Sequence, residues 1–191
     1  MKERGTAGLM NKVSIVIPMY YEEEVARECY NRLKKVLDGL KNYQNEIIFV
    51  NDGSKDNTLN EIKKLREQDK RVSYVDFSRN FGKEIGMIAG LDYATGDCVI
   101  IMDADLQDPP ELIPQMVELW EQGYDDVYAQ RKSRKGETWL KKFTSKMYYK
   151  VLQSLTRVPI QKDTGDFRLL DRRCVNALRK LRESQRNTKS M

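Results

Sequence analysis

The residues best suited to chemistry are two aspartates separated by one position, Asp103 and Asp105, which directly follow the apolar run 98–102. Two carboxylates at this spacing can bind one hard cation. Mg²⁺ or Mn²⁺ takes one or two carboxylates and keeps other positions for phosphate oxygens and water. Such a metal neutralises a diphosphate leaving group. Since about one Asp-x-Asp triplet arises by chance in this composition, the argument depends on its position after an apolar strand and on the segment 106–111 (LQDPPE) that follows.

The composition restricts the remaining chemistry. The chain has no histidine, which excludes a Ser-His-Asp or Cys-His mechanism and a histidine-ligated zinc site. Its three cysteines lie far apart and form no CxxC pair, which is typical of free, mostly buried thiols in a cytosolic protein. Acid, base and metal chemistry must therefore depend on carboxylates.

Other polar and aromatic residues also follow apolar runs. Asp52 could accept hydrogen bonds from a nucleobase or ribose, or could simply belong to a turn, and the two roles are compatible. Tyr20 could stack on a base, and Glu22 is expected to begin a helix, where negative charge is favourable. Asp166 is expected to face the reacting centre and Arg168 a phosphate; the alternative is a structural Asp166–Arg168 pair.

Regularly alternating elements would position these residues. Apolar runs at 13–18, 46–51, 72–77, 98–102 and 125–129 predict strands, and segments 22–40, 57–69, 82–94 and 110–122 have helical spacing. A short strand at 167–170 and a helix from Arg172 are expected later. This pattern predicts an α/β fold with a mostly parallel sheet, in which ligands bind beyond the carboxyl ends of the strands. Residues 1–11 read as a flexible lead-in to one domain at 12–191.

Positive charge is concentrated in one segment. The net charge is +5, and residues 131–157 hold nine Lys or Arg side chains against one acid. Within it, residues 139–155 (from Trp139 to Leu155) carry an apolar stripe flanked by lysines, which favours an interfacial helix on anionic lipid. A core-facing helix or a homo-oligomer interface are the alternatives. No aromatic platform or recognition helix supports nucleic-acid binding, and no apolar run is long enough to cross a bilayer.

Five motifs in this order resemble those of family 2 glycosyltransferases: PMYYEEE, VNDGS, SRNFGKE, DADLQDPPE and DTGDFRLLDRR. More narrowly, the set is similar to the polyprenyl-phosphate hexosyltransferases of the dolichol-phosphate mannosyltransferase and bactoprenol glucosyltransferase type. The resemblance runs from about residue 12 to the C-terminus. It implies a GT-A fold, which is a Rossmann-like, mostly parallel sheet with helices on both faces.

The resemblance also implies an activity and a site. The expected reaction is inverting transfer of a hexose from UDP-glucose or GDP-mannose to a polyprenyl (undecaprenyl or dolichyl) phosphate, with Mg²⁺ or Mn²⁺, at the cytoplasmic face of the cell membrane. Catalytic residues would be Asp105, Asp166 and Arg168. The metal ligands would be Asp103, Asp105 and Gln107. Arg131 and Arg134 would bind the acceptor phosphate. Nucleotide-sugar contacts would come from Pro18, Tyr20, Glu22, Asp52, Asn80, Lys83, Asp103 and Ala104.

Two departures from the family pattern accompany the resemblance. Tyr21 stands where the first motif usually has Asn, and the chain ends at Met191, where family members usually continue into membrane helices. A truncated fragment or a soluble form is therefore expected. Alternative functions are transfer to a glycan hydroxyl and a non-catalytic module at the membrane surface. A nucleotidyltransferase would need a Gly-rich phosphate loop after the first strand, where this chain has Tyr20, Tyr21 and three acids.

Overall fold

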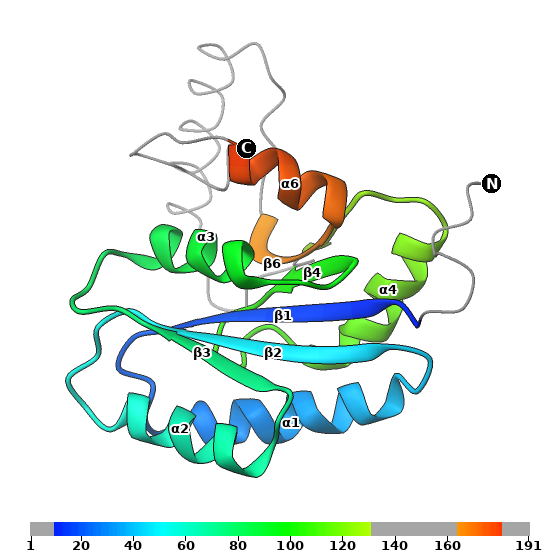
Figure 1. The fold of residues 1–191 in the computed structure, drawn as a ribbon. Coiled ribbons are helices and arrows are strands. Elements are labelled where there is room, and N and C mark those ends of the chain that lie inside the picture. The colour runs from blue at the N-terminus through cyan, green and yellow to red at the C-terminus, as the bar shows by residue number, and fades with distance from the viewer. Residues whose placement is uncertain (1–9, 131–163, 181–191) are drawn as a thin grey trace, which may run out of the picture.

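The computed structural model describes residues 10–130 and 164–180, and these form a sheet covered by helices on both faces (Figure 1). The six strands have the order β3-β2-β1-β4-β6-β5. The strands are β1 (Lys12–Met19), β2 (Gln44–Asn51), β3 (Val72–Asp76), β4 (Cys98–Ile101), β5 (Asp126–Gln130) and β6 (Thr164–Asp171). The helices are α1 (Ala26–Gly39), α2 (Thr58–Gln68), α3 (Lys83–Tyr93), the 3-10 turn η1 (Pro110–Leu112), α4 (Ile113–Glu121) and α6 (Arg172–Lys180).

The central strands are apolar along their length because helices bury both of their faces. β1 pairs in parallel with β2 and β4, and alternate residues enter opposite cores. Ile15 and Ile17 belong to the core beneath α1, α2 and α4, whereas Val16 belongs to the core beneath α3 and α6. The predicted α/β class and mostly parallel sheet are confirmed.

The sixth strand enters the sheet in a way that the sequence pattern did not indicate. β6 is longer than the predicted strand 167–170, and it lies between β4 and β5, antiparallel to both. Since β6 separates β4 from β5, the segment carrying Asp166 lies beside the strand that leads to Asp103. The helix predicted from Arg172 is present as α6.

The first helix begins later than predicted. α1 starts at Ala26 rather than at Glu22, and the Glu22 carbonyl accepts hydrogen bonds from the backbone N–H groups of Val25 and Ala26. The expectation that Glu22 begins a helix is therefore wrong, because this residue forms the turn that precedes it. None of the helices in the described part of the chain is long and apolar enough to cross a membrane.

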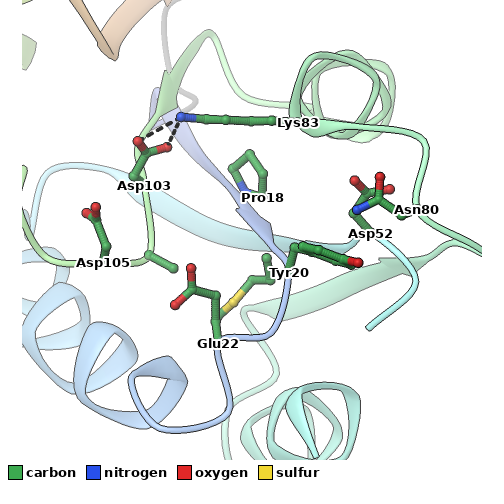
Figure 2. Close-up of a pocket in the computed structure, with 10 residues that line it drawn as sticks. Pro18, Tyr20, Glu22, Asp52, Asn80, Lys83, Asp103 and Asp105 are labelled. Carbon is green, nitrogen blue, oxygen red and sulfur yellow. Dashed lines mark hydrogen bonds and ion pairs between the residues drawn. The ribbon is translucent and has the colours of Figure 1, made fainter. Parts of the chain in front are cut away.

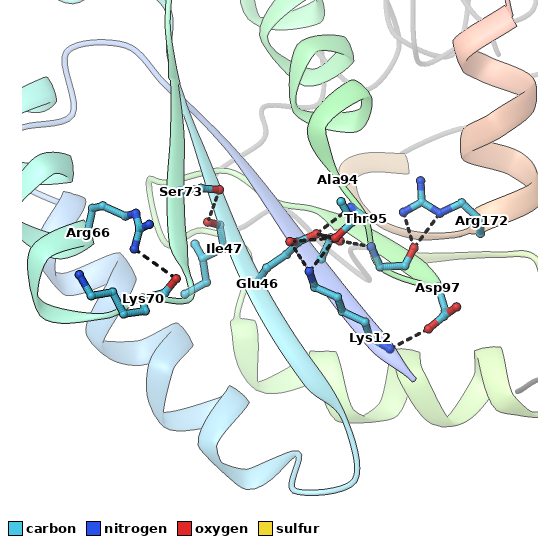
Figure 3. A network of polar contacts seen from close by, with 12 residues as sticks. Lys12, Glu46, Ile47, Arg66, Lys70, Ser73, Ala94, Thr95, Asp97 and Arg172 are labelled. Carbon is cyan, nitrogen blue, oxygen red and sulfur yellow. Dashed lines mark hydrogen bonds and ion pairs between the residues drawn. The ribbon is translucent and has the colours of Figure 1, made fainter. Parts of the chain in front are cut away.

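A polar network ties together the amino ends of the strands (Figure 3). The Glu46 carboxylate accepts hydrogen bonds from Lys12 Nζ at 2.6 Å and from the Thr95 backbone N–H at 2.7 Å. Burial opposes its ionisation, but the hydrogen bonds from Lys12, Ser14 and Thr95 outweigh burial and lower the pKa of Glu46. The Glu46 carboxylate is therefore engaged by partners within the protein.

Helix α3 approaches β1 closely, and a glycine permits this. A Cβ atom on Gly90 would lie 2.1 Å from Cγ1 of Val16, a stiff side chain in the middle of β1. One turn earlier, a Cβ on Gly86 would have its nearest neighbours at 3.7 Å. Helix α3 therefore has space for a Cβ atom at Gly86 but not at Gly90.

We predict opposite effects on stability for alanine at these two positions. Gly86→Ala should raise the free energy of unfolding by about 0.5–1 kcal/mol, because alanine is the better helix former. Gly90→Ala should lower it by about 1–2 kcal/mol, because overpacking against Val16 exceeds the propensity gain. Urea denaturation of both variants measures the difference, and equal effects would contradict the close approach of α3 to β1.

Two non-glycine residues near the carboxyl edge have left-handed backbone: Tyr21 with φ 57° and Leu106 with φ 60°. Such backbone costs most L-residues about 1 kcal/mol or more, and Asn tolerates it better. Tyr21 also packs edge-on against Tyr20, with ring centroids 4.6 Å apart. An Asn at position 21, which the resemblance would lead one to expect, would therefore suit this backbone better than Tyr21.

For Tyr21, we predict that Tyr21→Asn is more stable than Tyr21→Ala by about 1 kcal/mol. Both variants lose the Tyr20 contact, so their difference isolates the backbone term. Thermal or urea denaturation measures it. Equal stability of the two variants would show that the left-handed conformation carries no strain.

Candidate active site

Most of the residues predicted from the motifs meet in one pocket at the carboxyl ends of β1, β2 and β4 (Figure 2). Nine of the predicted site residues line it, and Met19 is the tenth lining residue, which the sequence did not single out. The nine are Pro18, Tyr20, Glu22, Asp52, Asn80, Lys83, Asp103, Ala104 and Asp105. An open parallel sheet binds ligands at this edge.

Asp52 anchors one wall of the pocket. Its carboxylate is buried and accepts two backbone N–H hydrogen bonds, from Phe81 at 2.7 Å and from Gly82 at 2.8 Å. The next residue, Gly53, has φ 66°, and a Cβ there would lie 2.3 Å from the carbonyl carbon of Arg79. The turn role expected for Asp52 is therefore present, and a carboxylate with two oxygens retains capacity for a ligand.

Lys83 connects two walls of the site. It is the first residue of α3, and its Nζ lies 2.6 Å from Oδ1 of Asp103 and 2.6 Å from Oδ2 of Asp166. Burial works against the charged form, yet the hydrogen bonds to Asp103 and Asp166 outweigh it and raise the pKa of Lys83. The ammonium is therefore charged at neutral pH. Asp166, predicted to face the reacting centre, is reached by a pocket residue although it does not line the pocket itself.

Three of the four acids that line the pocket lie close together: Glu22 comes from the turn after β1, and Asp103 and Asp105 share the loop after β4 (Figure 2). Burial raises the pKa of Asp103, and the ion pair with Lys83 offsets this only in part. Burial, followed by the charges of Asp105 and Asp103, raises the pKa of Glu22. The three acids therefore repel one another, and a cation between them would relieve this repulsion.

Asp103 and Asp105 fit a divalent metal by the chemistry of their donors. Asp105 is exposed, and one of its oxygens accepts the Gln107 backbone N–H at 3.0 Å, which orients the carboxylate in a local turn. Hard cations such as Mg²⁺ and Mn²⁺ prefer oxygen ligands and commonly use one or two carboxylates, with phosphate and water completing the shell. In the two described ranges, no group of three or more acidic, cysteine or histidine side chains is placed to hold a metal ion by itself, so phosphate oxygens and water would complete the shell.

The remaining predicted residues are not brought into the pocket. Gln107 is exposed and does not line it. Arg168 lies on β6 with its Nη1 3.9 Å from a carboxylate oxygen of Asp126. Within the described ranges, Asp166 therefore pairs with Lys83 and Arg168 with Asp126, and the alternative of an Asp166–Arg168 pair is wrong. Arg131, Arg134 and the predicted helix 139–155 lie outside the described residues.

Two hydroxyl side chains that the sequence analysis did not single out support the first motif. Ser54 Oγ accepts the backbone N–H of Tyr21 at 3.1 Å, and Thr58 Oγ1 accepts that of Glu22 at 2.9 Å. Ser54 and Thr58 follow Asp52 closely in the sequence, but Ser and Thr residues are common near turns and indicate no particular partner. Their contacts with the loop after β1 are visible only in the folded structure.

An aromatic rim borders the pocket. This rim consists of the Tyr20 side chain, which lines the pocket and is 45% exposed. Close in sequence to Asn80, the Phe81 ring contacts Phe77 edge-on and carries the Arg79 guanidinium 4.3 Å from its centroid, but neither phenylalanine lines the pocket. An exposed aromatic ring at the pocket suits the flat face of a nucleobase.

The chain is similar to known proteins over most of its length. The family model described as "Glycosyl transferase family 2" matches residues 14–179. An uncharacterized glycosyltransferase of Synechocystis is 53% identical over 94% of this chain and 56% of its own length. The bactoprenol glucosyl transferase of Shigella phage SfX is 42% identical over 90% of this chain and 56% of its own length. The chain thus spans about half the length of these curated relatives.

Solved structures agree on the fold. A mannosyltransferase from Pyrobaculum calidifontis, in complex with GDP-Man and Mn²⁺, matches with a TM-score of 0.61 at 20% identity over 90% of this chain and 47% of that one. Glucosyl-3-phosphoglycerate synthase from Mycobacterium tuberculosis, in complex with UDP, matches with a TM-score of 0.60 at 17% identity, over 91% of this chain and 63% of that one. At these identities the likeness concerns the fold alone. The family match over residues 14–179 shows that this chain belongs to glycosyl transferase family 2, and the solved structures show that its fold is GT-A-like.

Proposed function

We propose that this chain transfers a hexose from a nucleotide diphosphate sugar to a polyprenyl phosphate, with inversion at the anomeric carbon and with a divalent metal. The observation that carries the proposal is the pocket in which Asp103, Asp105 and Lys83 meet beyond the strand ends. Relatives at 42% identity are named bactoprenol glucosyl transferases. The fold neighbours from Pyrobaculum and Mycobacterium were solved with GDP-Man and Mn²⁺ or with UDP and Mn²⁺.

The donor would occupy the pocket from the aromatic rim to the acids. Tyr20 would stack on the nucleobase, and Asp52, with its carboxylate already fixed by two backbone N–H groups, would accept hydrogen bonds from the base or ribose. Asp105, assisted by Asp103, would hold Mg²⁺ or Mn²⁺, which supplies charge neutralisation for the leaving diphosphate. Glu22 adds negative charge beside these acids, which favours a cation at this place.

The acceptor chemistry explains why no histidine is needed. The second pKa of a phosphate monoester is about 6, so a polyprenyl phosphate is largely a dianion at neutral pH and can attack without a strong general base. The chain's task is then to position the two substrates and to balance charge. Lys83 lines the site and Asp166 contacts it. Arg168, Arg131 and Arg134 are the cations proposed to bind the acceptor phosphate.

The basic, apolar segment 139–155 is proposed to hold the enzyme on anionic lipid at the cytoplasmic face of the cell membrane. This location would bring a lipid-linked phosphate to the carboxyl edge of the sheet. This chain spans about half the length of its curated relatives. The activity of a full-length protein is therefore part of the same proposal.

The first test is nucleotide binding. Titration calorimetry with UDP and GDP should show binding of one of them that depends on Mn²⁺. Asp105→Asn should weaken it more than about tenfold, because this change removes a charged metal ligand while keeping an acceptor for the Gln107 N–H.

The matched control is Asp92→Asn, which removes an exposed carboxylate that lies 3.7 Å from Arg179 at the far end of α3. It should bind the nucleotide as the wild type does. If neither UDP nor GDP binds with Mn²⁺, the donor site is wrong, and the alternative of a non-catalytic surface module is favoured.

The second test concerns the acceptor. With vesicles that contain undecaprenyl phosphate and with labelled UDP-glucose or GDP-mannose, label should enter the organic phase. Vesicles that contain the corresponding polyprenol should give none, because the alcohol is not ionised at neutral pH. Label on a glycan hydroxyl, with none on the lipid phosphate, would reject the acceptor proposed here and support the glycan alternative.

A further inference from the structure

Lys83 holds the two sides of the site together through one ammonium group. Its Nζ lies 2.6 and 2.7 Å from the two oxygens of Asp103, which follows β4, and 2.6 Å from Asp166 of the antiparallel strand β6 (Figure 2 shows the Asp103 contact). The Asp103 carboxylate is thus engaged on both oxygens by a cation that belongs to the chain. Lys83 is the one basic side chain among the ten that line the pocket.

The position of this lysine is unfavourable without its acidic partners. Lys83 is the first residue of α3, where the helix dipole favours anions and disfavours a lysine. The turn before it is held by Asp52 through Phe81 and Gly82, and Gly82 has φ 98°. The backbone therefore fixes where the side chain starts, and the two aspartates determine where its ammonium lies.

A metal bound by Asp103 and Asp105 would need a carboxylate oxygen of Asp103, and Lys83 contacts both oxygens of that carboxylate. Two cations that share one carboxylate repel each other, so each weakens the binding of the other. A diphosphate changes this balance, because it offers new anionic oxygens to both the metal and the ammonium. The lysine can then leave Asp103 without losing ionic partners.

We propose that Lys83 is an exchangeable counter-ion: it competes with the metal for Asp103 in the empty pocket and makes tight metal binding conditional on the nucleotide diphosphate. This inference rests on the proposed function, since it concerns the same donor site. Lys83 would act on the metal through Asp103 and on the diphosphate through its own ammonium group. The two ligands are then coupled, and each raises the affinity of the other.

The experiment measures Mn²⁺ binding by electron paramagnetic resonance, with and without the nucleotide that the wild type binds. Removing the charge with Lys83→Met should tighten the binding of Mn²⁺ alone by about three- to tenfold, a modest factor because the lysine is 41% and Asp103 29% exposed. The factor by which the nucleotide raises Mn²⁺ affinity should shrink in the same variant. A purely structural role for Lys83 would not tighten metal binding.

Three further variants complete the design. Lys83→Gln repeats the charge removal with a polar side chain, so that the result does not depend on how one variant folds. Lys83→Arg keeps the charge and should bind Mn²⁺ alone as weakly as the wild type. Lys63→Met removes an exposed lysine on α2 and controls for the change in net charge.

The outcomes separate the two proposals. If the wild type binds the nucleotide with Mn²⁺ but Lys83→Met and Lys83→Gln bind Mn²⁺ alone no more tightly than it does, the counter-ion inference is wrong and the donor site stands. If the wild type binds no nucleotide with Mn²⁺, the proposed function fails and this inference fails with it.

Discussion

The site depends on a buried carboxylate that is satisfied by backbone groups. Asp52 emerges from β2 and accepts hydrogen bonds from the N–H groups of Phe81 and Gly82, which are almost 30 residues away in the chain. A buried acid without such partners would be costly, so the loop after β3 must close onto it. This closure fixes the start of α3 and with it Lys83, whose ammonium determines how Asp103 and Asp166 approach each other. One interaction thus connects the ends of β2, β4 and β6.

The charge balance of the pocket explains why it would bind a cation together with an anion. Four of its ten lining residues are acids and one is a lysine. Asp52 is stabilised by backbone dipoles, but Glu22 and Asp103 have raised pKa values, chiefly because burial disfavours their charged forms. A metal alone would relieve the repulsion among the acids while opposing Lys83. A metal with a diphosphate would satisfy both signs of charge, as in the transfer chemistry proposed for this family member.

Much of the fold could be predicted because the determining signals are local. The strands that become β1, β2 and β4 are continuous apolar runs, since both of their faces are buried, and the residues after them must share one edge of a parallel sheet. For this reason Asp52, Asp103 and Tyr20 could be assigned to one pocket. The insertion of β6 between β4 and β5 could not be predicted, because strand order depends on pairing between segments far apart in the sequence. The two ion pairs of β6 could not be predicted for the same reason. Asp126 becomes the neighbour of Arg168 only when β5 pairs with β6, and Asp166 reaches Lys83 only because β6 lies beside β4.

Helix α3 is fixed at both ends, and this limits which part of the site can respond to a ligand. At its carboxyl end, Arg179 of α6 donates hydrogen bonds to the carbonyls of Leu91 at 3.0 Å and Ala94 at 2.9 Å, where a cation also suits the helix dipole. At its amino end, Asp52 fixes the preceding turn. Gly90 lets the helix lie directly on β1 between these two points. The backbone is therefore preorganised, and the element free to change partner is the flexible four-carbon stem of Lys83. A counter-ion carried on such a stem can exchange a carboxylate for a phosphate without any movement of the fold.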